Sequence, residues 1–172
     1  MTVNTRKVSG RRAVRYDSYQ DLLDDAERLA VSDVQSLGNW SLGQALGHLA
    51  RAMEMSVEGS ELKAPWLVRF VARVFYRQRF LSGPMPAGFR LPRAASEALV
   101  PENQDSQTGL AELRRAIGRL HDEIDRARHP VLGELSLDEW DSLHLRHAEM
   151  HMSFLVPESA AVEAVAGGGS RR

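Results

Sequence analysis

Three histidines near the end of the chain fall on one side of a predicted helix. At 100° per residue, His144, His147 and His151 follow Trp140 at steps of four, three and four. A bundle helix usually places Leu or Ile at these positions, so the imidazoles are expected to face the interior. Each ring has two nitrogens that need partners, and an unpaired buried polar group costs about 1–3 kcal/mol. A metal ion would satisfy one nitrogen of each ring, and a hydrogen bond the other.

The spacing of these histidines indicates how such an ion would be held. His147 and His151 are an i, i+4 pair, the separation with which zinc-binding helices place two nitrogens on one ion. His144 has two interpretations, an additional ligand or a core residue that supports the ligands by hydrogen bonding. Another helix must supply a further ligand, and His48 is the candidate. Its helical wheel leaves the assignment open, because His48 lies away from the apolar stripe of its own helix.

Other polar residues receive different interpretations. His121 lies among charged residues and is expected to be solvated, whereas His129 precedes Pro130 at a helix end, where a cationic ring suits the helix dipole. Glu149 falls on the polar face opposite the histidine row, together with Arg146, and is therefore not a candidate general base. The sequence thus predicts a metal site without a nearby acid or base.

Composition limits the chemistry and the partners. With no cysteine among 172 residues, a metal site must use histidine and carboxylate ligands. The metal itself is not specified, since histidine suits Zn, Ni, Fe and Cu alike. A net charge of −1 argues against nucleic-acid binding. No run approaches the ~20 apolar residues of a transmembrane helix, so we expect a cytoplasmic protein.

The pattern along the chain predicts an all-α fold. Four long helices are expected, with N-caps at Asp17 or Ser18, Ser41, about Ser106 and Ser136, ending near residues 31, 58, 128 and 156. Residues 1–15 carry five basic residues and no acid, which predicts a flexible basic arm. The bundle would span residues 16–157, and residues 158–172 are expected to be a disordered tail.

An insertion separates the second and third bundle helices, over about residues 62–104. Seven basic residues and no acid lie between Leu62 and Ser96. The first part, residues 66–81, predicts a short amphipathic helix with arginines four apart on one side, and the Gly- and Pro-rich residues 83–92 predict an irregular segment. Three roles are open for these arginines. They would be solvated on a lid over the bundle, or contact an anionic surface. Alternatively, they would bind the carboxylates of a thiol cofactor.

The segment Gly38-Asn-Trp-Ser-Leu-Gly-Gln-Ala-Leu-Gly-His48, followed by His147-Ala-Glu-Met-His151, resembles the DinB/YfiT-like superfamily. More narrowly, residues 15–157 resemble a bacterial branch of unknown function. The resemblance implies a four-helix bundle in which His48, His147 and His151 bind a divalent metal such as Zn, Ni or Fe. It assigns no role to His144.

The same resemblance suggests what the metal would do. Relatives include S-transferases and an isomerase that use low-molecular-weight thiols, which implies a metal-dependent transferase or hydrolase with bacillithiol, mycothiol or glutathione as co-substrate. Homodimers are common among them. The alternative is a non-catalytic, metal-stabilised interaction module that associates with anionic surfaces through its basic helix. Because functions differ within one fold, the fold and the metal transfer better than the reaction.

Overall fold

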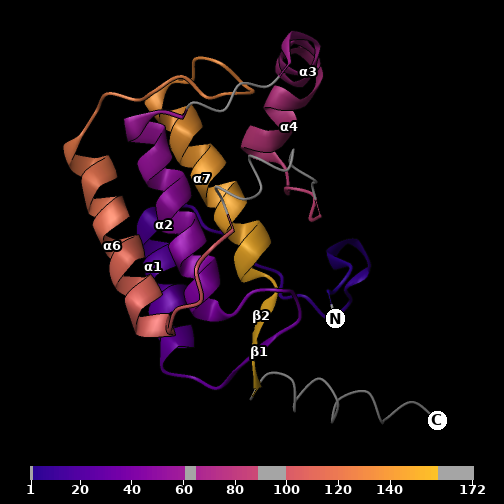
Figure 1. Cartoon of the computed structure of the whole chain (residues 1–172), viewed down its shortest axis with the longest axis vertical. Helices are drawn as coiled ribbons and strands as arrows, with labels where there is room; N and C mark the ends of the chain where they lie inside the picture. The colour runs from indigo at the N-terminus through magenta and orange to yellow at the C-terminus, as the bar shows by residue number, and fades with distance from the viewer. Residues whose placement is uncertain (1, 61–64, 89–99, 159–172) are drawn as a thin grey trace.

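The computed structural model describes residues 2–60, 65–88 and 100–158 (Figure 1). The helices α1 (Tyr19–Ala30), α2 (Leu42–Glu58), α6 (Ser106–Asp122) and α7 (Leu137–Met152) pack side by side as a bundle. The predicted disordered tail beyond residue 158, and the parts of the predicted insertion at 61–64 and 89–99, lie outside the described residues. The all-α bundle that the sequence predicts is confirmed.

The bundle helices begin where their N-caps predict. Ser18, Ser41 and Ser136 each cap a helix, and each forms a capping box with the residue three positions later. Helix α2 ends at Gly59, whose positive φ of 85° favours glycine. These caps fix the rotation of α2 and α7, and with it the direction in which their histidines point.

Helix α6 ends earlier than its periodicity predicts. The expected end was Arg128, but Glu123 has an extended backbone and Ile124 is 73% exposed. The Arg126 guanidinium donates a hydrogen bond to the Leu120 carbonyl, and the Ala127 amide donates to the Ser56 carbonyl. These bonds satisfy backbone groups that a longer helix would have paired, and they direct the chain toward the loop before α7.

Helix α2 lies very close to α6 because glycines replace larger residues at their crossing. A Cβ built on Gly109 would lie 2.5 Å from the Gly43 carbonyl oxygen. The core between α1, α2, α6 and α7 is formed by buried apolar side chains, including Leu22, Leu29, Leu46, Leu49, Met53, Leu113 and Met152. This close packing holds α2, and therefore His48, at a fixed depth in the bundle.

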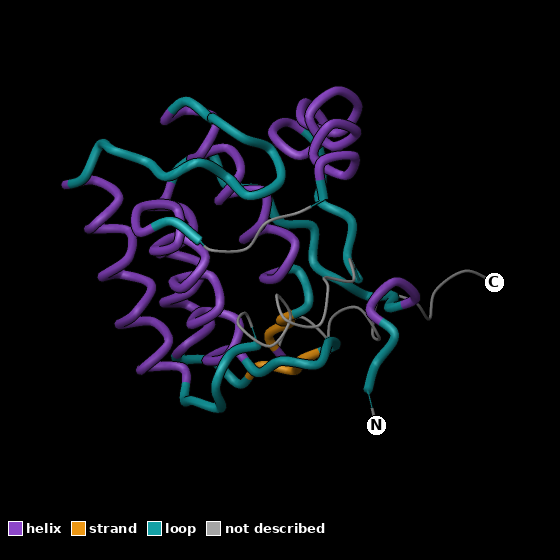
Figure 2. Tube along the Cα trace, turned by 45° about the horizontal axis from the view of Figure 1, so that its top comes forward, coloured by secondary structure: helices purple, strands orange, loops and turns teal. Residues whose placement is uncertain are grey.

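A small antiparallel sheet corrects the expectation that the chain has no strands and that its last helix continues to Val156. Strand β1 (Val34–Ser36) pairs with β2 (Leu155–Pro157), and Gln35 lies opposite Val156 (Figure 2). The apolar residues after Met152 continue the pattern of the helix, so periodicity alone does not separate them. The pairing ties the loop before α2 to the end of α7.

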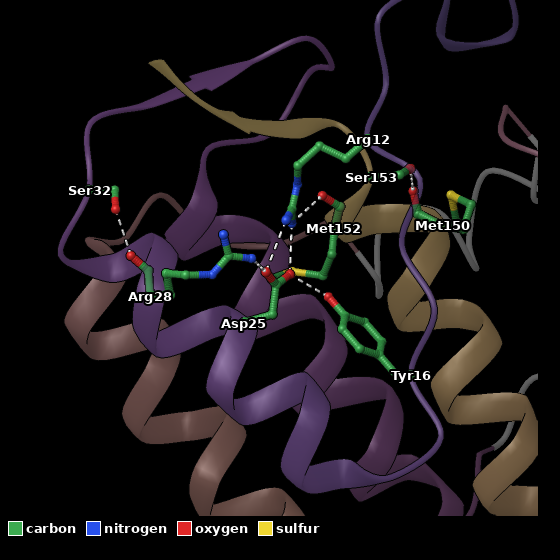
Figure 3. Close-up of polar contacts among 8 residues, drawn as sticks. All are labelled: Arg12, Tyr16, Asp25, Arg28, Ser32, Met150, Met152 and Ser153. Carbon is green, nitrogen blue, oxygen red and sulfur yellow. Dashed lines mark hydrogen bonds and ion pairs between the residues drawn. The ribbon is translucent and has the colours of Figure 1, made fainter. Parts of the chain in front are cut away.

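The predicted flexible arm makes ordered contacts at residues 11–16. Arg12 forms two hydrogen bonds to the Asp25 carboxylate, at 2.9 and 2.7 Å, and the Tyr16 hydroxyl donates a third at 2.6 Å (Figure 3). The Arg11 guanidinium bonds Ser153 of the α7 C-cap. Asp25 is buried, so its charge needs these partners, and that requirement holds the segment against α1 and α7.

A separate helical segment stands beside the bundle. It consists of α3 (Trp66–Val71), the π-helical turn η2 (Ala72–Tyr76) and α4 (Arg77–Ser82), which run on without a break (Figure 1). Ala72 packs with Leu132, Trp140 and Leu143 in a second, smaller core. Within the described ranges, no helix has the length and apolar character needed to cross a bilayer.

The glycine crossing predicts opposite effects for two alanine substitutions in α6. Gly109→Ala forces the new methyl group onto the α2 backbone and should reduce the free energy of unfolding by about 1–3 kcal/mol. Gly118→Ala is the matched control, since a Cβ there meets nothing within 4 Å. That change should stabilise the protein by about 0.5–1 kcal/mol through helix propensity. Urea unfolding of both variants checks the prediction, and equal effects would contradict it.

The buried Asp25 predicts a loss of stability in acid. Burial raises the pKa of its carboxyl, but hydrogen bonds from Arg12 and Tyr16 outweigh this and hold the pKa below its usual value. The stabilisation is therefore present above the unfolded pKa of about 3.9 and is lost as the pH falls through the lower folded value. Asp25→Asn should cost about 3–5 kcal/mol at pH 7, because it leaves the Arg12 charge unpaired.

The difference between wild type and Asp25→Asn should shrink below about pH 4, as the wild-type carboxyl becomes protonated. Denaturant unfolding at pH 7, 4 and 3 measures this difference. Asp24→Asn is the control, because Asp24 lies on the same helix but is exposed to solvent. Its carboxylate accepts a hydrogen bond from the side-chain amide of Gln20. A constant difference across the pH range would show that Asp25 does not act through its charge.

Candidate metal centre

Two helices bring three histidines together. His48 of α2 is buried, while His147 and His151 of α7 are half-buried. The Nε2 atom of His147 lies 3.3 Å from Nε2 of His48 and 3.0 Å from Nε2 of His151. One ligand nitrogen from each ring lies within 4.8 Å of the other two. The spacing predicted the His147–His151 pair, and the structure places His48 beside it.

The position of His48 explains the ambiguity of its helical wheel. Helix α2 is buried on more than one side, because Ala45, Leu46 and Leu49 are buried as well as His48. The leucine stripe faces the core, while the side that carries His48 faces α7. A helix enclosed on two sides has no single apolar face, so its wheel could not show which side meets the partner helix.

The donor set fits a transition-metal ion. Ligands on a tetrahedral ion with Zn–N bonds of about 2.0–2.1 Å are separated by about 3.3 Å, close to the nitrogen distances found here. Without an ion, three converging nitrogens must share hydrogen bonds, and each bond requires one ring to donate and the other to accept. The group could therefore hold a metal ion.

Burial keeps the imidazoles of His147 and His151 neutral. The pKa of His147 lies well below its usual value, chiefly because burial penalises the charged ring and also because His48 is close. Burial lowers the pKa of His151 in the same way, with His147 as the next cause. Neutral imidazole is the form that binds metals, so at neutral pH no proton would have to be removed from these rings first.

Trp40 orients two of the rings and was not predicted as a site residue. Its indole stacks on His151, with ring centroids 4.9 Å apart and planes 15° apart, and lies 4.7 Å from the His48 ring. Trp40 directly precedes the Ser41 N-cap, so the cap that starts α2 also places the indole. The only sequence signal was an aromatic residue beside the cap of the histidine-bearing helix.

His144 lies on the same side of α7 but outside the three-histidine group. The Tyr19 hydroxyl donates to Asp141 at 2.8 Å and lies 2.9 Å from Nδ1 of His144. Since a hydroxyl has one proton, His144 must donate from Nδ1, which leaves Nε2 unprotonated. That nitrogen is buried without a hydrogen-bond partner. Burial lowers the pKa of His144 to about 3, in agreement with a neutral ring.

The polar face of α7, opposite the histidine row, is covered by other parts of the chain. Arg146, Glu149 and Ser153 are buried there. Glu149 accepts a hydrogen bond of 2.8 Å from the Tyr16 amide and pairs with Arg146 at 3.0 Å. The polar pattern was correct, but residues 11–16 supply partners for it. Glu149 therefore points away from the histidines, as predicted.

The remaining histidines differ from each other. His121 is exposed, as predicted. The expectation of a cationic His129 at a helix end is wrong. Its Nδ1 accepts hydrogen bonds from the amides of Val131 and Leu132, and burial lowers its pKa to about 4. The turn folds back over the ring. Because both amides donate to Nδ1, this nitrogen must be unprotonated.

The stacking of Trp40 predicts a loss of metal affinity on its removal. Trp40→Ala frees the rings of His48 and His151 to rotate, and should weaken Zn²⁺ binding about 10–100-fold, the range seen when residues that orient ligands are replaced. Competition titration with a chromogenic chelator measures this. Trp66→Ala is the matched control, because Trp66 is 76% exposed and lies outside the group. Equal affinities for the two variants would contradict an orienting role.

Comparison with known proteins adds a family but no activity. The model of one family, described as "Protein of unknown function (DUF1569)", matches residues 8–158. No curated protein and no solved structure gave a significant match. The matched range includes the three histidines, Trp40, and the Tyr19–Asp141–His144 contacts.

Proposed function

Since the chain belongs to the DUF1569 family of unknown function, we propose an activity from the geometry of the three-histidine group. The protein would be a metal-dependent S-transferase that uses a low-molecular-weight thiol. One observation carries the proposal, the convergence of three imidazole nitrogens from two helices, with the rings of His147 and His151 kept neutral by burial. The sequence resemblance to the DinB/YfiT-like superfamily supports the same three ligands and a thiol co-substrate.

A site with three protein ligands leaves coordination positions open, as in catalytic rather than structural sites. A divalent ion bound there would lower the pKa of a thiol or water on it toward neutrality. His48, His147 and His151 would hold the ion, and Trp40 would fix two of the rings. His144 would support this end of α7 through Tyr19 and Asp141 and would not itself be a ligand.

The lack of a carboxylate favours the thiol over water as the nucleophile. Among the described residues, no Asp or Glu joins the three-histidine group. A thiol needs only a modest lowering of its pKa of about 8.5 to ionise at pH 7, whereas hydrolysis usually also needs a group that moves protons. The thiol sulfur would form a bond to an electrophilic carbon, the leaving group would depart, and the thiol proton would pass to solvent.

The test combines metal content with turnover. Wild-type protein purified without an affinity tag should contain about one Zn, Ni or Fe ion per chain by elemental analysis, and should transfer bacillithiol, mycothiol or glutathione to model electrophiles. His147→Ala should lose the metal and at least about 10²-fold in rate, because the central nitrogen of the group is gone. His121→Ala is the control, since that histidine is exposed.

Full activity in metal-free His147→Ala would overturn the proposal. Metal binding that raises the melting temperature without any turnover would instead favour the second candidate, a non-catalytic, metal-stabilised interaction module. The observation that favours this candidate is the large apolar surface on α3 and η2, which a soluble enzyme has no need to expose.

A further inference from the structure

The segment formed by α3 and η2 turns an apolar side away from the protein. Trp66 is 76% exposed and Phe75 70% exposed. Leu67, Val68, Phe70, Val71, Val74 and Tyr76 of the same segment are exposed as well, and these eight residues together are here called the apolar face. Single exposed apolar residues are normal, but a contiguous set of this size usually marks a surface that binds something.

The contacts of the opposite side fix this orientation. The Arg77 guanidinium forms two-pronged hydrogen bonds to Glu139 of α7, at 2.6 and 2.7 Å. The Arg73 guanidinium lies over the turn at Gly133, where a Cβ would come within 2.9 Å of it. Ala72 is buried against the same region. Arg77 and Ala72 therefore attach the segment to the bundle, while the residues of the apolar face stay exposed.

At Arg77 this arrangement differs from the expected lid of solvated arginines. A segment that used its apolar residues to pack would place the arginines in solvent. Here the Glu139 carboxylate accepts Arg77, and the exposed Arg73 lies beside the turn at Gly133. Figure 1 shows α3 set apart from the bundle and α4 leading back toward it.

Charge indicates what would cover the apolar face. Residues 62–96 contain seven basic residues and no acid, although the whole chain has a net charge of −1. Arg69 and Arg73 border the face on one edge and form, with Trp66, Phe70 and Val74, the wall of an open hollow of about 400 Å³. Arg79 is exposed on the following turn. The apolar face thus has a basic rim.

A basic rim disfavours self-association and favours an anionic surface. Two copies packed face to face would bring basic edges together without a carboxylate between them. An anionic bilayer has an apolar interior that can bury the aromatic and aliphatic side chains, and negatively charged headgroups that attract the arginines. Because no described helix is long and apolar enough to span, the segment would lie in the plane of the interface.

We propose that the apolar face of α3 and η2 docks this protein reversibly on anionic lipid bilayers, with its basic rim at the level of the headgroups. The binding is separate from the metal site, since the face and the three histidines share no residue. The chain would therefore bind bilayers with or without its metal ion.

Vesicle sedimentation of the full-length protein tests the proposal. The protein should pellet with vesicles of phosphatidylcholine containing about 30% phosphatidylglycerol, and at least tenfold less with pure phosphatidylcholine. Raising the salt from 0.05 to 0.5 M should weaken binding severalfold by screening the rim. The double variant Phe70→Ser/Phe75→Ser should bind anionic vesicles at least tenfold more weakly, because two large apolar side chains are lost.

The control variant Val31→Ser/Ile124→Ser removes two apolar side chains that are 83% and 73% exposed but lie elsewhere. It should bind vesicles as wild type does. Melting temperature and metal content verify that both variants fold. Failure of wild type to bind anionic vesicles, or equal loss in both variants, would overturn the proposal. A wild-type dimer that Phe70→Ser/Phe75→Ser converts to a monomer, without vesicle binding, would assign the face to a second copy or another protein.

Discussion

Helix α7 buries polar side chains on both of its sides, and much of the structure serves to give them partners. Arg146 and Glu149 lie on one side and His144, His147 and His151 on the other. An unpaired buried polar group costs about 1–3 kcal/mol, so neither side is stable against a purely apolar neighbour. The packing around α7 is therefore decided by hydrogen bonding as much as by apolar area.

The polar side chains on the two sides of α7 have different kinds of partner. On the first side, the Tyr16 amide donates a hydrogen bond to Glu149. The Arg12–Asp25 pair holds the same segment in place (Figure 3). On the second side, Nδ1 of His144 contacts the Tyr19 hydroxyl, while its Nε2 is buried without a hydrogen-bond partner. The Nε2 atoms of His48 and His151 both lie within hydrogen-bond distance of Nε2 of His147, and this group could hold a metal ion. The asymmetry separates the structural side of α7 from the side suited to chemistry.

Local sequence signals predicted the parts of this arrangement that depend on neighbours along the chain. The Ser-x-x-Glu and Ser-x-x-Gln capping boxes at Ser136 and Ser41 fixed both histidine-bearing helices, and the i, i+4 spacing paired His147 with His151. The approach of His48 depends on the crossing of α2 with other helices, partly set by Gly43 and Gly109, and no local pattern encodes it. Resemblance to a known superfamily was needed for that ligand.

The errors have the same origin in distant contacts. The basic residues of the arm suggested flexibility because their partner, Asp25, lies in another element. The cover over the polar face of α7 was not predicted, because the chain that covers it comes from residues 11–16. Strand β2 appeared helical because its partner β1 lies more than a hundred residues earlier. His129 appeared cationic until the turn at Val131 and Leu132 placed two amides on its ring.

Glu139 links the histidine-bearing helix α7 to the outward-facing segment. Its carboxylate accepts the Ser136 amide, which starts α7, and also binds Arg77, which attaches α4. Eight to twelve residues later on the same helix lie His147 and His151, about 12–18 Å away at 1.5 Å per residue. A surface that bound the apolar face would therefore hold the three histidines at a set distance from itself, through a continuous helix. Because one carboxylate serves both contacts, the start of the helix and the attachment of the segment are stabilised together.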